Sequence, residues 1–286
     1  MENVTETSGT PGTAETATGA ATEAVTGAVP GPATEPTTGS TTEPATEPQA
    51  NAPAEAPGTV EQVIQRMREI DGSLDGRDGV RSFNHMYLRV TELVAQHIQQ
   101  GTFQDPEFLE RMDVLFAGLY FKAVDAGASG GDVPTPWKPL FDARENRTIW
   151  PIQFALAGMN AHINHDLPVA VVETCKERGT TPGTDPVHAD YLRVNDLLAK
   201  VESEVRAEFE TKLIHLATED AEALKHAVSA FTIARGRDAA WGTARTLWSQ
   251  RNNPLAYRAT LETVAQSVAQ LSRFTILVPV VPPPPE

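Results

Sequence analysis

Residues 151–168 read PIQFALAGMNAHINHDLP, an apolar stretch that contains a dense group of polar side chains. The proline at its start suits the first turn of an α-helix, where a backbone N–H has no intrahelical partner to lose. At about 100° per residue, a helical wheel divides the polar side chains into two opposite stripes. One stripe holds Gln153, Asn160 and Asn164, and the other holds His162, His165 and Asp166. Because apolar residues occupy both flanks, we expect a helix enclosed by other helices.

The other helices are predicted from periodic apolar residues and from capping residues. Thr59 and Gln62 have the spacing of a capping box, and the helix that they begin ends at Asp71-Gly72. A second helix is expected over about 80–100. Three Asp-Pro or Asn-Pro pairs each place an N-capping side chain before a helix-starting proline. These pairs are Asp105-Pro106, Asp185-Pro186 and Asn253-Pro254, and they predict helices over 105–126, 185–216 and 253–272.

The remaining segments give less regular patterns. Pro168 is expected to end the central helix soon after Asp166, and a short apolar helix follows over 168–176. A helical stretch is predicted between 218 and 251, and 127–150 is predicted to be irregular. Alternating strand character is confined to 274–281. The sequence therefore predicts an all-α fold, a single compact bundle-like domain of about seven or eight helices.

The first 58 residues have a different composition from the rest of the chain. They contain no Lys, Arg, aromatic residue, Leu or Ile, and are built from Thr, Ala, Gly, Pro, Glu and Val with few other residues. Such a segment buries too little apolar surface to offset the entropy of ordering it. We therefore expect three parts: a disordered acidic tail over 1–58, the all-α domain over 59–273, and a Pro-rich C-terminal tail over 274–286, polyproline II in its last residues.

The charge and the apolar runs exclude several classes of function. The net charge is −15, and no basic face that would bind phosphates is evident, so a nucleic-acid partner is not expected. No run of about 18 apolar residues occurs, and so no membrane span is predicted. No signal peptide is visible, and the single Cys175 cannot form an internal disulfide. We expect a soluble cytoplasmic protein.

The histidines of the central helix define one candidate site. His162 paired with His165 or with Asp166 has the i, i+3 or i, i+4 spacing that presents two ligands to one metal ion. A third or fourth ligand would come from another helix, and the candidates are His85 and either His188 or Asp190. In this interpretation His85, His162, His165 and Asp166 hold a divalent metal, and His162 and Asp166 are catalytic residues of a metal-assisted hydrolase.

A second group of polar residues lies on otherwise apolar helix faces and would line a pocket for a small-molecule ligand. Its members are Asn84, Tyr87, Asn160, Asn164, Asp190, Tyr191 and Asn195. The alternative is that these side chains bond to one another across helices and fix the packing of a non-catalytic interaction module. Whether the protein is an enzyme stays open at this point.

Two other patterns bear on function. Arg237 and Arg245 alternate with Trp241 and Trp248, which indicates either an amphipathic packing face or an anion site. A terpene-cyclase-like enzyme is a remote alternative. Asn195-Asp196 begins like the metal-binding triad of those enzymes, but Ala199 stands at the following motif position, where Ser or Thr is expected.

Three stretches together resemble a helical family of unknown function, DUF5995. They are FNHMYL at 83–88, PIQFALAGMNAHIN at 151–164 followed by DLP at 166–168, and Asp190-Tyr191 with Asn195. The resemblance covers most of 60–272 and not the acidic tail. It implies that these stretches belong to one compact domain, and it implies no activity and no catalytic residue.

Overall fold

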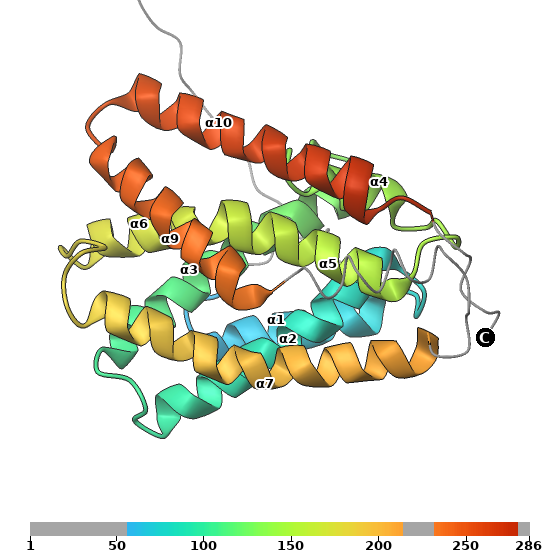
Figure 1. Cartoon of the computed structure of the whole chain (residues 1–286), viewed down its shortest axis with the longest axis horizontal. Helices are drawn as coiled ribbons and strands as arrows, with labels where there is room; N and C mark the ends of the chain where they lie inside the picture. Colours follow the sequence, from blue (N-terminus) through green and yellow to red (C-terminus); the bar gives the residue numbers. More distant parts are fainter. Residues whose placement is uncertain (1–55, 214–231, 280–286) are drawn as a thin grey trace, which may run out of the picture. The chain divides into compact units, whose positions relative to one another are not determined.

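The computed structural model describes residues 56–213 and 232–279 of the chain. The expected disorder of the acidic tail, residues 218–231 of the helical stretch predicted between 218 and 251, and the polyproline end lie outside these residues. The described part is helical and contains no strand, which confirms the all-α prediction (Figure 1). No described helix is long and apolar enough to cross a membrane.

Within each described range the helices follow one another along the chain (Figure 1). Two of the elements, η1 and η2, are single π-helical turns. The elements are α1 (Val60–Ser73), α2 (Gly79–Gln99), α3 (Pro106–Ser129), α4 (Lys138–Ala143), α5 (Pro151–Ala161), η1 (His162–Asp166), α6 (Leu167–Glu177), α7 (Val187–Leu213), α9 (Ile233–Ser249), α10 (Pro254–Leu271) and η2 (Ser272–Ile276).

Three of the predicted N-caps are confirmed. The side chains of Thr59, Asp105 and Asn253 each accept a hydrogen bond from a backbone N–H of the first turn of α1, α3 and α10. The prediction for Asp185-Pro186 is wrong. Val187 N donates to Thr184 O at 3.0 Å, so the two residues form the middle of a turn and α7 begins after them.

The prediction that Pro168 ends the central helix is also wrong. α5, η1 and α6 form one continuous helical segment, and Pro168 lies in the first turn of α6, directly after the wide turn η1. In η1 the N–H of Leu167 donates to the carbonyl of His162, five residues back. In such a π turn each N–H bonds to the carbonyl five residues back, where in an α-helix it would bond four residues back. Turns of this kind are often found at functional sites.

The structure revises two further segments. The interval 127–150 is not wholly irregular, because α3 continues to Ser129 and α4 lies inside it. The described part of 274–281, the stretch with alternating strand character in the predicted C-terminal tail, forms the end of η2 and a short extension. Gln153 Nε2 donates to the carbonyl oxygens of Ile276 and Val278 at 2.7 and 2.8 Å, and Leu277 is buried. The packed domain thus continues past residue 273.

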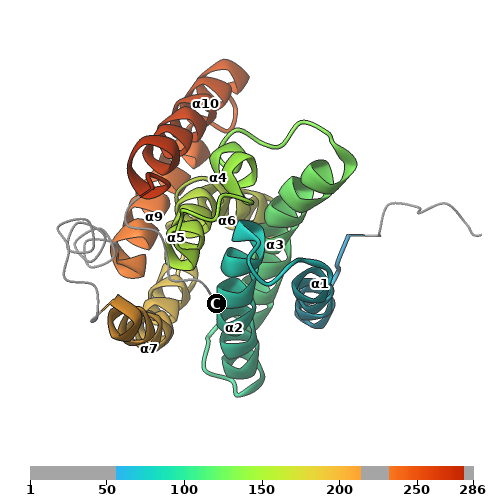
Figure 2. The same ribbon diagram turned by 90° about the vertical axis from the view of Figure 1, so that its right-hand side faces the viewer.

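The core forms around the crossing of α2 and α5. A side chain at Gly158 would place its Cβ 2.3 Å from the ring of Phe83, and one at Gly79 would place its Cβ 2.4 Å from the ring of Phe154. Because glycine stands at both positions, each helix leaves room for a phenylalanine ring of the other, and the two helices approach closely. α5 lies between α2 on one side and α9 and α10 on the other (Figure 2). The histidine-rich turn η1 is therefore enclosed, as its apolar flanks predicted.

Candidate functional site

Asp166, in the turn η1, is the centre of a buried hydrogen-bond network. Its Oδ2 accepts from Trp137 Nε1 at 2.9 Å and lies 3.1 Å from His162 Nδ1. Its Oδ1 lies 2.7 Å from His165 Nδ1. Burial alone would raise the pKa of Asp166, but the hydrogen bonds from His162 and His165 hold it below its usual value. The carboxylate is ionised and only accepts, so Nδ1 of His162 carries a proton.

The ring of His162 is packed among aromatic side chains. It stacks on Phe116 with ring centroids 3.4 Å apart, and the edge of Tyr87 approaches at 4.5 Å. Burial lowers the pKa of His162, and this outweighs the opposing effect of Asp166. The ring is therefore neutral near pH 7, and its second nitrogen, Nε2, is an unprotonated acceptor.

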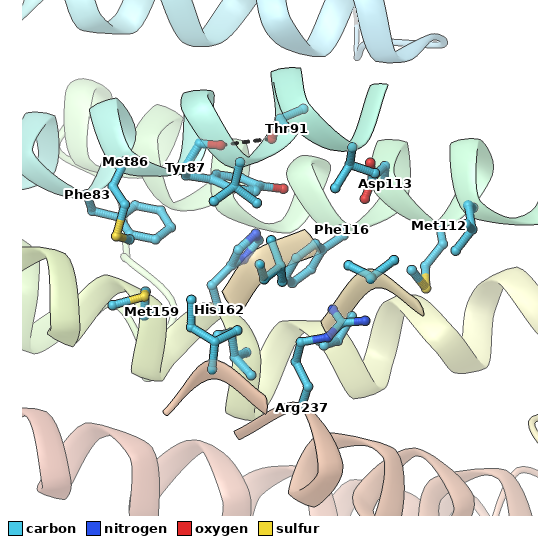
Figure 3. Close-up of a pocket in the computed structure, with 18 residues that line it drawn as sticks. Phe83, Met86, Tyr87, Thr91, Met112, Asp113, Phe116, Met159, His162 and Arg237 are labelled. Carbon is cyan, nitrogen blue, oxygen red and sulfur yellow. Dashed lines mark hydrogen bonds between the residues drawn. The ribbon is translucent and has the colours of Figure 1, made fainter. Parts of the chain in front are cut away.

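Nε2 of His162 is buried and has no hydrogen-bond partner within the described residues. The ring lines a cavity of about 70 Å³ between α2, α3, α7, α9 and the α5–η1–α6 segment (Figure 3). A water needs roughly 10–15 Å³ measured in this way, so the cavity can hold several waters or a small molecule. Apart from Thr91, Asp113, His162 and Arg237, the lining is aliphatic, aromatic or Met: Phe83, Met86, Tyr87, Val90, Val94, Leu109, Met112, Phe116, Met159, Ile163, Leu167, Val194, Leu198 and Ile233.

Asp113 of α3 is the second polar group that lacks a partner at this cavity. Its Oδ2 is buried and makes no hydrogen bond to any described residue. Burial raises the pKa of Asp113 to about 7, although the positive charge of Arg237 works in the opposite direction. Near pH 7 this carboxyl group therefore exchanges between its protonated and ionised forms.

Arg237 of α9 lines the same cavity, and residues of α7 fix the position of its guanidinium group. Its Nε donates to Asn195 Oδ1 at 2.6 Å, and its Nη2 donates to the carbonyl of Tyr191 at 2.9 Å. The guanidinium carbon also lies 4.1 Å from the centre of the Tyr191 ring. The Tyr191 hydroxyl donates in turn to the carbonyl of Arg237 at 2.7 Å. The position of the cation is thus fixed by two residues that the sequence had placed in the ligand site.

The asparagines of the central helix face away from this cavity. Asn160 Nδ2 donates to the Val268 carbonyl and to Ser272 Oγ at 3.0 and 2.9 Å, and Asn164 donates to Asn160 Oδ1 at 2.9 Å. The bonds of Asn160 join α5 to α10 and η2, and Asn164 of η1 bonds to Asn160. The asparagine stripe and the histidine stripe thus meet different neighbours.

The other residues predicted to bind a ligand also have different roles in the structure. Tyr87 lines the cavity, whereas Asn84 donates to the carbonyl of Met67 at 2.9 Å and so ties α2 to α1. Asp190 Oδ2 accepts from the backbone N–H groups of Gln104 and Asp105 before α3. Of the predicted ligand-binding residues, one lines the cavity, Tyr191 and Asn195 support Arg237, and Asn84, Asn160, Asn164 and Asp190 bond between segments of the fold.

The four predicted metal ligands are not gathered at one point. His85 is two-thirds exposed on the outer side of α2, and its Nδ1 lies 3.7 Å from Asp71. His162 and His165 both direct Nδ1 at Asp166. Over 56–213 and 232–279, no group of three or more His, Cys, Asp and Glu side chains is placed to hold a metal ion.

Of the two charged residues at the cavity besides His162, the sequence did not identify Asp113 as a site residue, and it offered Arg237 only as part of a possible anion site. Asp113 follows Leu109 and precedes Phe116 at helical spacing, so it is an acidic side chain on an apolar stripe. Arg237 was noted only with the nearby tryptophans. It stacks on Tyr191 of α7 instead, while Trp248 is covered by Arg251 at 4.5 Å. To place Arg237 at the cavity, one must know that α7 packs against α9, and the sequence does not show this packing.

The site therefore belongs to an all-α domain with a buried, largely apolar cavity and an oriented histidine. The chain belongs to the family of unknown function DUF5995, whose model matches residues 60–278. Comparison with curated proteins and with solved structures gave no match.

Proposed function

We propose that this domain binds a small, largely apolar molecule in the cavity beside η1, and that His162 Nε2 accepts a hydrogen bond from its polar group. The observation that supports this most is the unpartnered Nε2 at the wall of an otherwise apolar cavity. A buried acceptor without a partner costs about 1–3 kcal/mol, and a ligand that donates to it recovers part of that free energy.

The Asp166 network supports the same proposal. Because Asp166 accepts from three donors, it holds the His162 ring in one orientation and keeps the proton on Nδ1. An oriented neutral imidazole beside a carboxylate is also the arrangement of a general base, so acid–base chemistry on the bound molecule is the enzymatic form of this proposal.

A second candidate is a non-catalytic helical module. The hydrogen bonds of Asn84, Asn160 and Asp190, which all join separate segments of the fold, favour it. It accounts for the asparagine stripe, but it leaves His162 Nε2 and Asp113 Oδ2 without partners. The two candidates therefore differ in what they require of the cavity.

The test is a titration of the full chain with isobutanol, a small probe that has one donor on an apolar body. Long-range proton–nitrogen NMR follows the ring nitrogens of His162. Binding as proposed shifts Nε2 in a saturable way, and Val90→Phe, which fills the cavity, abolishes the shift. His165 bonds to the same carboxylate but does not line the cavity, so its Nε2 signal is the internal control. Equal, non-saturating shifts at both histidines would overturn the proposal.

A further inference from the structure

Asp113 and Arg237 form the second polar region of the cavity. Asp113 comes from α3 and Arg237 from α9, and they enter the cavity from different walls (Figure 3). They are close enough for the charge of the guanidinium to lower the carboxyl pKa. Yet Asp113 Oδ2 has no hydrogen-bond partner in the described chain. An acidic and a basic side chain thus face one space without bonding to each other.

The bonds of Arg237 keep its guanidinium group from moving toward Asp113. Two of its nitrogens already donate to α7, through Asn195 Oδ1 and the carbonyl of Tyr191, and its guanidinium plane lies over the Tyr191 ring. Moving the guanidinium toward Asp113 would break two hydrogen bonds inside a buried region, at about 1–3 kcal/mol for each group left unsatisfied. The separation of the two charges is therefore maintained by the fold.

We infer that this part of the cavity is a subsite for a primary carboxamide, whose NH₂ donates to Asp113 and whose carbonyl oxygen faces Arg237. The inference rests on the proposed function and adds a second polar region of the ligand, besides the group that donates to His162, together with its chemical class. A carboxylate would suit Arg237 but would be repelled by ionised Asp113, and an ammonium group would suit Asp113 but would be repelled by Arg237. A neutral group with a donor and an acceptor on one carbon satisfies both side chains.

The surrounding apolar walls strengthen this selection. Leu109, Met112 and Val194 line the same cavity, so a ligand that enters it gives up most of its water. A charged group needs full compensation in such a place, whereas a neutral amide needs only its hydrogen bonds. Isobutyramide, isobutyrate and isobutylamine share one apolar body and differ in the polar group, and they form a matched series of probes.

The experiment titrates the full chain with each of the three probes at about pH 8, where Asp113 is largely ionised, and follows the His162 ring by NMR. Isobutyramide is expected to bind at least about tenfold more tightly than either charged probe. In Asp113→Asn, isobutyrate binding is expected to improve about tenfold, since Arg237 is then unopposed. Asp132→Asn removes an exposed carboxylate away from the cavity and should leave all affinities unchanged.

The possible failures are distinguishable. If isobutyrate or isobutylamine binds most tightly, or if Asp113→Asn leaves the order of the probes unchanged, the carboxamide subsite is wrong while the ligand cavity stands. If neither these probes nor isobutanol shifts His162 in a saturable way, the proposed function itself is wrong.

Discussion

Both faces of the α5–η1 segment carry buried polar side chains, but the side chains of the two faces have different roles. On one face Asn160 and Asn164 have hydrogen-bond partners in the protein, in α10, η2 and each other. On the other face His162 has one nitrogen fixed by Asp166 and the other left open at a cavity. Buried polar residues that stabilise a fold are expected to have their partners within it. The open nitrogen is what distinguishes a candidate site from a packing network.

Replacing Asp166 with Ala should give the largest loss of stability. It leaves Trp137 Nε1 and His162 Nδ1 as buried donors without an acceptor, at about 1–3 kcal/mol each. The unfolding free energy should fall by about 3–5 kcal/mol in urea denaturation. His165→Ala, which removes only one partner of the carboxylate, is the control and should cost less. Equal losses in the two variants would show that the network is not centred on Asp166.

Asn160→Ala tests the asparagine face and should have the next largest effect. The side chain is fully buried, and its removal leaves the Val268 carbonyl and Ser272 Oγ without this donor. We expect a loss of about 2–3 kcal/mol by denaturation. Asn164→Ala, at a half-buried position that donates only to Asn160, should cost less than about 1 kcal/mol. A loss in Asn160→Ala as small as that in Asn164→Ala would contradict the role assigned to this face.

Asp113→Asn should stabilise the protein at high pH. Burial raises the pKa of Asp113 to about 7 in the folded protein, so between about pH 4 and pH 7 the folded state holds a proton that the unfolded state has lost. The unfolding free energy of the wild type therefore falls as pH rises through this range. The Asn variant lacks that loss and should be more stable by about 1–3 kcal/mol at pH 8, and much closer to wild type at pH 5. A variant less stable than wild type at pH 8 would show that Asp113 has a partner when ionised.

His162→Phe should have the smallest effect on stability at pH 7. The substitution keeps an aromatic ring beside Phe116, and Asp166 retains its bonds from Trp137 and His165. We expect a change below about 1 kcal/mol, as is common where a residue serves a site more than the fold.

The same variant has a pH signature. The lowered pKa of His162 gives stability that is present above about pH 6.5 and is lost as pH falls, because the unfolded chain then takes up the proton first. His162→Phe should remove this acid-side loss. Comparing unfolding free energies at pH 7 and pH 5 measures it, and an unaltered pH dependence would mean that the pKa of His162 is the same in the folded and the unfolded protein.

The sequence was sufficient for features that depend on neighbouring residues. Thr59, Asp105 and Asn253 cap their helices as predicted, because an N-cap needs only its own first turn. The two stripes of the central segment were also visible from helical periodicity. Pro168 was misread because the rule for proline assumes a regular α-helix, and the π turn η1 changes the backbone that precedes it.

The cavity could be predicted only in part. His162 was selected from its pattern, and Tyr87 from its place on an apolar face. The functional state of His162, however, depends on Trp137 and Phe116, which come from other segments of the fold. Arg237 obtains its orientation from two residues of α7. Contacts between residues this distant in sequence cannot be read from local patterns.

The most direct test of the account is the protonation of His162 in the full chain without added ligand, measured by nitrogen-15 NMR of its ring across pH 5 to 8. We predict a neutral ring at pH 7 with the proton on Nδ1, an Nε2 signal typical of a bare acceptor, and a pKa below the usual value of about 6.5. A proton on Nε2 at pH 7, or a pKa above that value, would contradict the claim that an oriented, open acceptor faces the cavity.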